Sequence, residues 1–359
     1  GAGQAEGSKV TYKNILIIKM SSLGDVIHAL PFAAALRETF PDSRISWLVH
    51  PQFSAFVPEP PIIDEVLYFD KKAFGKMGWG DKWKTLRETR ALLRSKNFDL
   101  VIDLQGLFKS AVMAWLTGCP NRIGYCEMRE GSRLVSRPIA GAHAHDHVIE
   151  RYLDVARYLG AKVEKITYPM PALREEGETI RQRLREAGVP EKEKMPYAVL
   201  VPGARWETKR WPLEHYAALA RKFLQDGTWV VLAGGPEDKP LGEKIRDLVG
   251  PEPRLLDWIG KTSLRELGAL IKGARCYVSG DTGPLHIATA LQKPLVTIYG
   301  PTRPDRTGPY GNPRATVLVS PAKCAGCLKK HCDHWTCMGE VTPDQVYALC
   351  REKEENSCD

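Results

Sequence analysis

Short, uninterrupted runs of apolar and often β-branched residues alternate with helix-like segments along most of this 359-residue chain. The first run, residues 14–19, is typical of a strand buried on both faces of a parallel sheet. A glycine-bearing loop follows at residues 20–25, and residues 26–40 place apolar side chains at helical spacing. Repeated strand–loop–helix units of this kind predict an α/β fold built on parallel sheets.

The alternation runs through two halves of the chain, separated by residues 167–174, where two prolines interrupt the pattern. We therefore predict two Rossmann-like domains that face each other across a cleft. The expected strands lie at residues 14–19, 45–49, 65–69, 100–103, 197–201, 229–233, 276–279 and 295–298. The expected helices lie at residues 26–40, 82–96, 105–116, 145–159, 213–225, 239–249, 264–272, 284–291 and 342–355. The Gly-, Arg- and Pro-rich residues 119–144 are expected to form a surface loop.

The length of the chain also favours two domains. Residues 1–13 are expected to be a disordered tail or one left by cloning, because they begin small and polar. Residues 14–170 and 171–320 are the two predicted Rossmann-like domains. Residues 321–359 form a cysteine-rich segment with a terminal helix.

Composition narrows the class of partner. Hydrophobic residues make up 43% of the chain and charged residues 26%, as in soluble globular proteins. The formal net charge of +8 favours anionic partners such as nucleotides, phosphorylated glycans or an acidic membrane surface. We expect no nucleic-acid partner, because we interpret the basic excess as diffuse. No apolar run reaches the roughly 18 residues that a membrane span needs, so we expect a cytoplasmic protein.

The stretch from Val278 to His286 (Val-Ser-Gly-Asp-Thr-Gly-Pro-Leu-His) joins a predicted strand, a glycine turn and a helix start. Pro284 suits the first turn of a helix, and Asp281 and Thr282 are good capping residues. Free backbone N–H groups and the positive end of the helix dipole make such a place an anion site. The alternative is an ordinary capped helix with a packed histidine.

Two further loops carry charge after predicted strands of the second half. Lys209 and Arg210 lie between Trp206 and Trp211, and Arg205 precedes them. These cations predict a diphosphate site, although a solvated basic loop would look the same. Glu237 and Asp238 follow the next strand, where a carboxylate often accepts hydrogen bonds from ribose hydroxyls, or caps a helix.

In the first half, Asp25 follows Gly24 in the loop after the first strand. A carboxylate just before a helix N-terminus stays ionised. Such a group can act as a general base toward a hydroxyl. The alternative is that Asp25 only caps a helix beginning at Val26.

Four of the nine cysteines are clustered: Cys324, Cys327, Cys332 and Cys337. Four thiols at this separation could hold a structural zinc ion or an iron–sulfur cluster, although the spacing is not that of a paired zinc ribbon. Disulfides or reduced thiols are the alternatives.

Five stretches together carry a family pattern. They are residues 19–31 (Lys-Met-Ser-Ser-Leu-Gly-Asp-Val-Ile-His-Ala-Leu-Pro), 101–107, 209–212, 279–286 and 299–302. They resemble glycosyltransferase family 9, the bacterial ADP-heptose:lipopolysaccharide heptosyltransferases, and the resemblance runs from Ile15 to about Tyr347. The loop at residues 21–28 looks most like that of the members that add the first heptose to Kdo-lipid A.

The resemblance implies a GT-B fold, in which residues 14–170 bind the acceptor and residues 171–320 bind the nucleotide sugar. It also implies metal-independent, inverting transfer of heptose from ADP-L-glycero-D-manno-heptose. By position, Asp25 would deprotonate the acceptor hydroxyl and Lys209 would bind the phosphates, while Glu237 or Asp238 would meet the ribose. The other expected donor contacts are Gly24, Arg205, Thr262 near the adenine, Asp281, Thr282, Gly283 and His286. The expected contacts with the anionic Kdo sugars are Lys109, His147 and Arg151.

The sequence departs from the family pattern at one place, so the donor contacts of the loop at residues 202–212 stay open. Ala204 and Arg205 stand where members of this kind can carry hydroxyl residues. We expect no required cofactor and a monomer peripheral to the cytoplasmic face of the inner membrane. The alternatives are a family 9 transferase with another nucleotide sugar or a later core acceptor, or a non-catalytic nucleotide-sugar-binding module. The presence of both Asp25 and Lys209 favours an enzyme.

Overall fold

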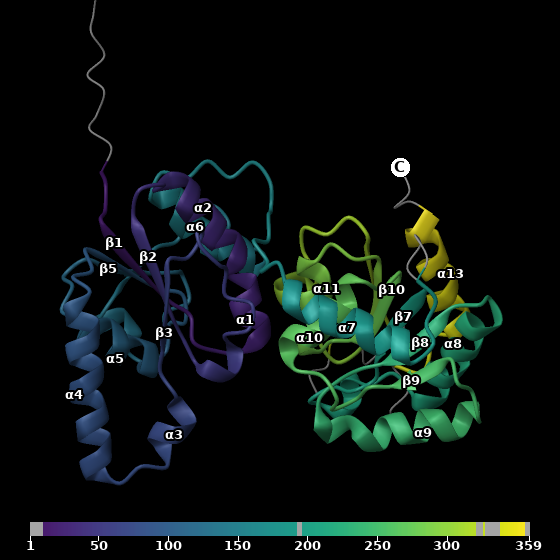
Figure 1. The fold of residues 1–359 in the computed structure, drawn as a ribbon. Helices are drawn as coiled ribbons and strands as arrows, with labels where there is room; N and C mark the ends of the chain where they lie inside the picture. Colours follow the sequence, from purple (N-terminus) through teal and green to yellow (C-terminus); the bar gives the residue numbers. More distant parts are fainter. Residues whose placement is uncertain (1–9, 192–195, 321–325, 327–337, 356–359) are drawn as a thin grey trace, which may run out of the picture. The chain divides into compact units, whose positions relative to one another are not determined.

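A computed structural model describes residues 10–191, 196–320, 326 and 338–355. The chain divides into two compact units, unit 1 ending at Pro171 and unit 2 beginning at Ala172. Each unit holds one six-stranded parallel sheet with helices on both faces (Figure 1). In the described part of the chain, no helix has the length and apolar character needed to span a membrane.

The sheet of unit 1 has the strand order β3-β2-β1-β4-β5-β6. Its strands are β1 (Asn14–Ile18), β2 (Arg44–Val49), β3 (Glu65–Tyr68), β4 (Leu100–Asp103), β5 (Arg122–Gly124) and β6 (Arg137–Pro138). Along the chain, β2 and β3 are added on one side of β1, and β4, β5 and β6 are then added on its other side. The loops after β1 and β4 therefore flank the switch point, where open α/β sheets bind ligands.

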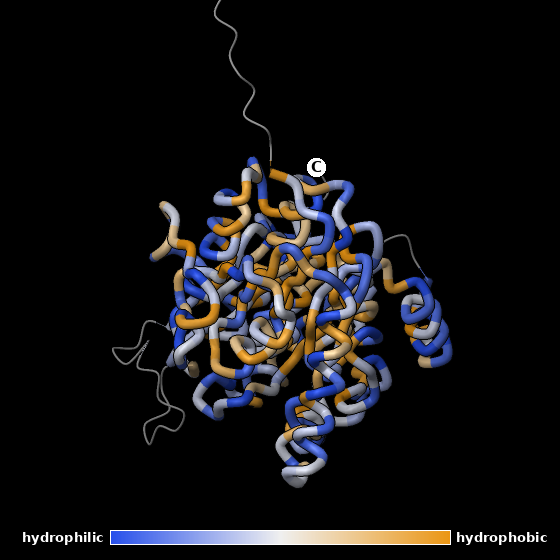
Figure 2. Tube along the Cα trace, turned by 90° about the vertical axis from the view of Figure 1, so that its left-hand side faces the viewer, coloured by the Kyte–Doolittle hydropathy of each residue, from blue (hydrophilic) through white to orange (hydrophobic). Residues whose placement is uncertain are grey.

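The helices of unit 1 are α1 (Leu23–His28), α2 (Leu30–Thr39), α3 (Lys71–Gly75), α4 (Trp79–Ser95), α5 (Phe108–Leu116) and α6 (Val148–Tyr158). Helices α4 and α5 pack on one face of the sheet through an apolar cluster, while α1, α2 and α6 lie on the other face (Figure 1). Figure 2 shows hydrophobic stretches gathered inside and hydrophilic ones outside, which is the distribution that burial of apolar surface favours.

Two predictions in unit 1 were wrong. Residues 119–144 are not only a surface loop, because they contribute β5 and β6 to the sheet. These strands have three and two residues, too short to show a periodic pattern. The single helix expected at residues 26–40 is two helices, because Pro31 lacks the N–H needed to continue the hydrogen-bond ladder. The first of them begins at Leu23 rather than Val26.

The sheet of unit 2 has the order β12-β11-β10-β7-β8-β9, with its switch point between β7 and β10. Its strands are β7 (Tyr197–Val201), β8 (Trp229–Leu232), β9 (Leu255–Asp257), β10 (Cys276–Gly280), β11 (Leu295–Tyr299) and β12 (Ala315–Val319). Its helices are α7 (Arg174–Glu186), α8 (Leu213–Gln225), α9 (Lys239–Val249), α10 (Leu264–Lys272), α11 (Gly283–Ala290), α12 (Pro304–Thr307) and α13 (Pro343–Glu355). The elements α7, β9, α12 and β12 were not predicted.

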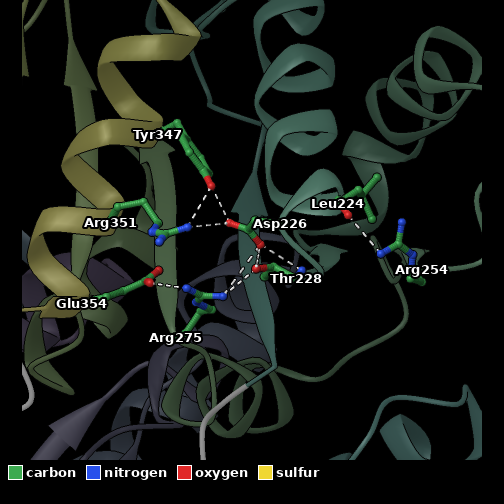
Figure 3. A network of polar contacts seen from close by, with 8 residues as sticks. All are labelled: Leu224, Asp226, Thr228, Arg254, Arg275, Tyr347, Arg351 and Glu354. Carbon is green, nitrogen blue, oxygen red and sulfur yellow. Dashed lines mark hydrogen bonds and ion pairs between the residues drawn. The ribbon is translucent and has the colours of Figure 1, made fainter.

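Helices α8, α9 and α13 share one apolar core with the sheet of unit 2. A polar network also fixes α13 at the start of two strands (Figure 3). Arg351 and Tyr347 of α13 donate hydrogen bonds to Asp226, and Arg275, just before β10, pairs with Glu354. Arg275 also donates to Thr228 Oγ1, at 2.6 Å. The terminal helix is therefore tied to the strand whose other end carries the candidate site.

Candidate functional site

Two charged side chains of unit 2 meet at the switch point. Lys209 ends a 3₁₀ turn, η3 (Glu207–Lys209), in the loop after β7, and Asp281 follows β10. The Nζ atom of Lys209 lies 3.0 Å from Oδ2 of Asp281, and both side chains are 16% exposed. We call these two residues the switch-point pair. They form an ion pair that is partly shielded from water but still reachable from it.

Asp281 is held by two further donors. Thr302 donates from Oγ1 to the Asp281 carboxylate at 2.9 Å, and the Tyr299 hydroxyl lies 3.4 Å from its other oxygen. Burial and then the Asp281 carboxylate raise the pKa of Tyr299 well above its ordinary value, so this hydroxyl stays protonated as a donor. In this state Asp281 positions the Lys209 ammonium group.

The loop that carries Lys209 is fixed from three sides. A Cβ atom at Gly280 would lie 2.4 Å from the Lys209 carbonyl oxygen, so the loop backbone requires a glycine at the end of β10. The Lys209 Nζ atom lies 4.3 Å from the centre of the Trp206 ring, in a cation–π contact. Trp211 is fully buried, and its indole N–H donates to the Val341 carbonyl at 2.8 Å. The tryptophans therefore hold the loop in place.

The start of α11 lies beside this pair in sequence. Thr282 is the N-cap residue with an extended backbone, and Gly283 and Pro284 open the helix. Thr282, Gly283 and His286 are half-buried. The first N–H groups of a helix lack intrahelical partners and carry a partial positive charge. An anion could therefore contact Lys209 and this helix terminus.

Glu237 and Asp238, in the turn η4 (Pro236–Asp238), have different surroundings. A Cβ atom at Gly203 would lie 2.0 Å from the Asp238 carboxylate, which therefore reaches the loop after β7. Burial, and then the charge of Glu237, raise the pKa of Asp238, and the charge of Arg210 opposes them. Glu237 is exposed.

Thr262 and Arg205 lie farther along the loops of the same sheet edge. Thr262 is half-buried and directly precedes Ser263, the N-cap residue of α10. Its loop is tied to the one after β8 by a hydrogen bond from Gly260 N to Gly234 O at 2.8 Å. Arg205 is exposed. The predicted donor residues of unit 2 are thus distributed over neighbouring loops at the carboxyl ends of its strands.

In unit 1, Asp25 is the third residue of α1 rather than a residue before the helix. Its Oδ2 atom accepts hydrogen bonds from the backbone N–H and the hydroxyl of Ser22, each at 3.0 Å. The capping role that was the alternative to a base is thus present here. The carboxylate is half-buried, beside the equally half-buried Gly24. Gly24 therefore belongs to unit 1 and is adjacent to the candidate base.

A lysine cluster (Lys19, Lys71 and Lys109) lies beside the loop that leads to Asp25. The buried Lys19 donates to the Leu104 carbonyl at 3.2 Å, and Lys71 donates to the Ser21 hydroxyl at 2.9 Å. Burial, and then the positive charges of Lys109 and Lys19, lower the pKa of Lys71. Mutual repulsion of this kind favours an anionic ligand.

Lys71 was missed by sequence reasoning. Two adjacent lysines after the helix cap Asp70 were the only local signal, and they resemble any exposed helix start. Only the fold brings the α3 start to the loop after β1. The predicted Lys109 is exposed and belongs to the same cluster.

His147 and Arg151 have partners in unit 1. His147 is buried, its Nδ1 accepts from Ile149 N–H as a helix cap, and its ring meets that of His28 in α1 edge to face. Arg151 pairs with Glu127 and donates to the Asp146 carbonyl at 2.8 Å. Without a bound ligand, both of these predicted acceptor contacts are therefore engaged by other residues of unit 1.

The clustered cysteines Cys324, Cys327, Cys332 and Cys337 lie outside the described residues, so the predicted zinc or iron–sulfur site stays a prediction. In the described part of the chain, no group of His, Cys, Asp and Glu side chains is arranged to hold a metal ion. Cys119, Cys126, Cys276 and Cys350 are free thiols.

Comparison with known proteins identifies the family. Residues 86–336 match glycosyltransferase family 9 (heptosyltransferase). The chain is 32% identical over 337 residues to lipopolysaccharide heptosyltransferase 1 of Pseudomonas aeruginosa, covering 89% of this chain and 87% of that protein. The chain belongs to glycosyltransferase family 9. It is therefore a glycosyltransferase, as the motifs predicted.

Other family 9 proteins are also similar. Lipopolysaccharide heptosyltransferase 2 of Escherichia coli K12 is 29% identical over 316 residues, covering 85% of this chain and 87% of that protein. An E. coli heptosyltransferase solved with ADP superposes with a TM-score of 0.74 at 25% identity, covering 95% and 99% of the two chains. A family 9 structure from Veillonella parvula gives a TM-score of 0.83 at 23% identity, covering 97% and 99%. These structures confirm the predicted α/β GT-B fold class.

Proposed function

We propose that this family 9 protein is an inverting heptosyltransferase of lipopolysaccharide core synthesis. It would move heptose from ADP-L-glycero-D-manno-heptose to the Kdo-lipid A acceptor. The observation that carries the proposal is the switch-point pair beside the N-terminus of α11. Support comes from relatives named lipopolysaccharide heptosyltransferase and from an E. coli relative solved with ADP.

The donor half of the reaction belongs to unit 2. The diphosphate of ADP-heptose would bind Lys209 and the free N–H groups at Thr282 and Gly283. Negative charge grows on this diphosphate as the bond to the anomeric carbon breaks. A fixed ammonium group and a helix terminus stabilise that charge with little reorganisation, which is the main source of rate in such sites. We expect transfer to persist in the presence of a chelator.

Lys209 would change partners when the donor arrives. Its ion pair with Asp281 holds the ammonium group in place before binding, and Thr302 and Tyr299 keep Asp281 from following it. The ribose would meet a carboxylate of the loop after β8. We favour Asp238 over Glu237 because its carboxylate reaches the loop after β7.

The acceptor half belongs to unit 1. The carboxylate of Asp25 would take the proton from the attacking sugar hydroxyl as the new glycosidic bond forms. A single displacement at an oxocarbenium-like carbon needs only one base and inverts the configuration. Two hydrogen bonds from Ser22 orient the carboxylate. The lysine cluster would hold the carboxylates of the Kdo sugars.

A second candidate follows from the similarity to E. coli heptosyltransferase 2. The protein would then act on a later core acceptor or use another nucleotide sugar. A non-catalytic nucleotide-sugar-binding module is the third candidate. We favour a monomer that works at the cytoplasmic face of the inner membrane.

One experiment separates these candidates. The purified protein is incubated with ADP-heptose or with other nucleotide sugars, and with Kdo-lipid A or with Kdo-lipid A that already carries one heptose. We expect a product of one added heptose only from ADP-heptose and Kdo-lipid A. Product only on the pre-heptosylated acceptor would favour the second candidate. Nucleotide binding without transfer to either acceptor would favour the binding module.

A further inference from the structure

The positive charge of the chain is concentrated in one segment. Residues 71–96 contain nine lysines and arginines and two acidic residues, a net charge of +7, whereas the whole chain carries +8. The interpretation of the basic excess as diffuse was therefore wrong. This segment comprises α3, the turn after it and α4, and we call it the α3–α4 surface.

Most of the α3–α4 surface faces water. In the 17 residues of α4, Leu93 alone is buried. Trp79 and Trp83, in the first turns of α4, are 81% and 65% exposed. The Lys82 ammonium group lies 5.4 Å and 5.6 Å from the ring centres of Trp79 and Phe74. Figure 1 shows α3 and the start of α4 extending away from the sheet of unit 1.

Two large exposed indole rings among many cationic side chains suit the interface between an anionic bilayer and water. Tryptophan is enriched where a bilayer meets water, because its ring is apolar and its N–H is polar. Lysine and arginine on the same surface are attracted to anionic headgroups. We propose that the α3–α4 surface docks this protein on an anionic phospholipid bilayer, with Trp79 and Trp83 inserted among the headgroups.

The location of this surface is consistent with a lipid-linked acceptor. Lys71, its first residue, donates a hydrogen bond to Ser21, and the adjacent Ser22 binds Asp25. Docking would therefore bring the loop of the candidate base close to the headgroup layer, where the sugars of a glycolipid lie. This step rests on the proposed function, whereas the docking itself does not.

Docking is tested by co-sedimentation of the full-length protein with vesicles. The vesicles contain phosphatidylcholine alone or with phosphatidylglycerol, and hold no acceptor lipid. We expect binding only to the anionic vesicles.

Near such a surface each basic residue contributes a factor of about five to binding. The triple variant Lys76→Glu/Lys84→Glu/Arg87→Glu should therefore bind at least about 100-fold more weakly. Trp79→Ala/Trp83→Ala should weaken binding about 10-fold.

The matched control is Lys162→Glu/Lys165→Glu, two exposed lysines of unit 1 outside the surface. This control variant should bind anionic vesicles within about threefold of the parent protein. The small loss comes from its lower net charge, because the two lysines do not contact the bilayer. Equal loss of binding in the control and the triple variant would overturn the proposal, as would wild-type binding by the triple variant. Tighter binding of the wild-type protein to single-stranded RNA than to anionic vesicles would also overturn it.

A second measurement separates this proposal from the proposed function. Transfer to a Kdo disaccharide without acyl chains is assayed for the triple variant and the tryptophan variant. We expect near-wild-type transfer to this soluble acceptor, together with lost transfer to Kdo-lipid A in vesicles. Equal loss with both acceptors would contradict a docking role. Vesicle binding by a wild-type protein that transfers to neither acceptor would contradict the proposed function and leave the docking surface supported.

Discussion

The two sheet edges use the same residue types in different ways. In each unit a lysine follows the first strand, and an aspartate lies at the end of the strand across the switch point. In unit 2 these are Lys209 and Asp281, which pair directly at 3.0 Å and stay partly exposed. In unit 1 they are Lys19 and Asp103, which are both buried.

The buried pair of unit 1 is satisfied locally. Asp103 accepts hydrogen bonds at 2.9 Å from Gln105 N, Gly106 N and the Ser110 hydroxyl, and burial raises its pKa. Lys19 donates to a carbonyl instead. Gln105 in turn accepts from the backbone at Met20, which ties the loop after β4 to the loop after β1. The same topology thus yields a ligand-ready pair in one unit and a structural anchor in the other.

The strongest test of this comparison concerns the candidate base. Asp25→Ala should lower turnover by about 10²–10⁴-fold, the usual contribution of a general base. ADP affinity should stay within a few-fold, because the expected donor residues other than Gly24 lie in unit 2. Single-turnover transfer and calorimetry with ADP measure the two effects. Asp42→Ala, an exposed carboxylate change in unit 1, should leave both unchanged. Near-wild-type turnover of Asp25→Ala would remove Asp25 from the role.

The next largest effect is expected at the switch-point pair. Lys209→Ala should weaken ADP binding by about 10- to 100-fold, because one charge-assisted hydrogen bond to the diphosphate is lost. Isothermal titration calorimetry measures this directly. Lys244→Ala is the matched control, since Lys244 is an exposed lysine of unit 2 that lies on α9, outside the loops of the candidate site, and its effect should be under about threefold. Equal losses in the two variants would mean that only the total charge of unit 2 matters.

Asp103→Ala should act on stability rather than on binding. Removing a buried acceptor leaves three donors without their partner, which should lower the free energy of unfolding of unit 1 by about 2–3 kcal/mol. Urea unfolding measures the loss. Asp281→Ala is the comparison, because its carboxylate is partly exposed, and it should cost under about 1 kcal/mol while changing ADP affinity. A larger stability loss for Asp281→Ala would contradict the contrast between the two edges.

The smallest expected effect concerns pH and the terminal helix. Burial alone would raise the pKa of Asp226, but hydrogen bonds from Thr228 and Tyr347 and the charge of Arg275 hold it below its ordinary value. A depressed pKa in the folded state stabilises the fold above the unfolded-state pKa of about 3.9, and this stabilisation is lost as pH falls through the folded value. Asp226→Asn should therefore lower the free energy of unfolding at pH 7 by about 1–2 kcal/mol.

The pH series supplies the check on that variant. The difference between Asp226→Asn and the parent protein should shrink as the pH is lowered from 5 toward 3, measured by thermal unfolding. Glu243→Gln on α9 is an exposed control that should show no such convergence. A constant difference across this range would mean that the charge of Asp226 has no part in holding α13.

Much of the fold could be predicted because its signals are local. The runs that form β4, β7, α8, α9 and α10 have the bounds expected from apolar periodicity. Strand β12 was missed although its run Ala-Thr-Val-Leu-Val carries the same signal, whereas two other missed elements lack it. Helix α7 is strongly charged, with only Ile180 and Leu184 buried, and β9 has three residues. Local patterns therefore indicated the elements with a large apolar face and missed those that are held by their neighbours.

The sequence alone determined the α/β class, the family and the loops in which polar residues follow strands, since these depend on periodicity and on motifs of a few residues. The strand order decided the rest. Lys209 and Asp281 meet because β10 pairs with β7, and Lys71 reaches the loop before Asp25 because α3 packs beside it. Such pairings depend on burial summed over a whole sheet, which no short stretch of sequence encodes. The net charge of +7 in residues 71–96 can be counted from the sequence, but only the structure shows that α4, the longer helix of that segment, has a single buried residue.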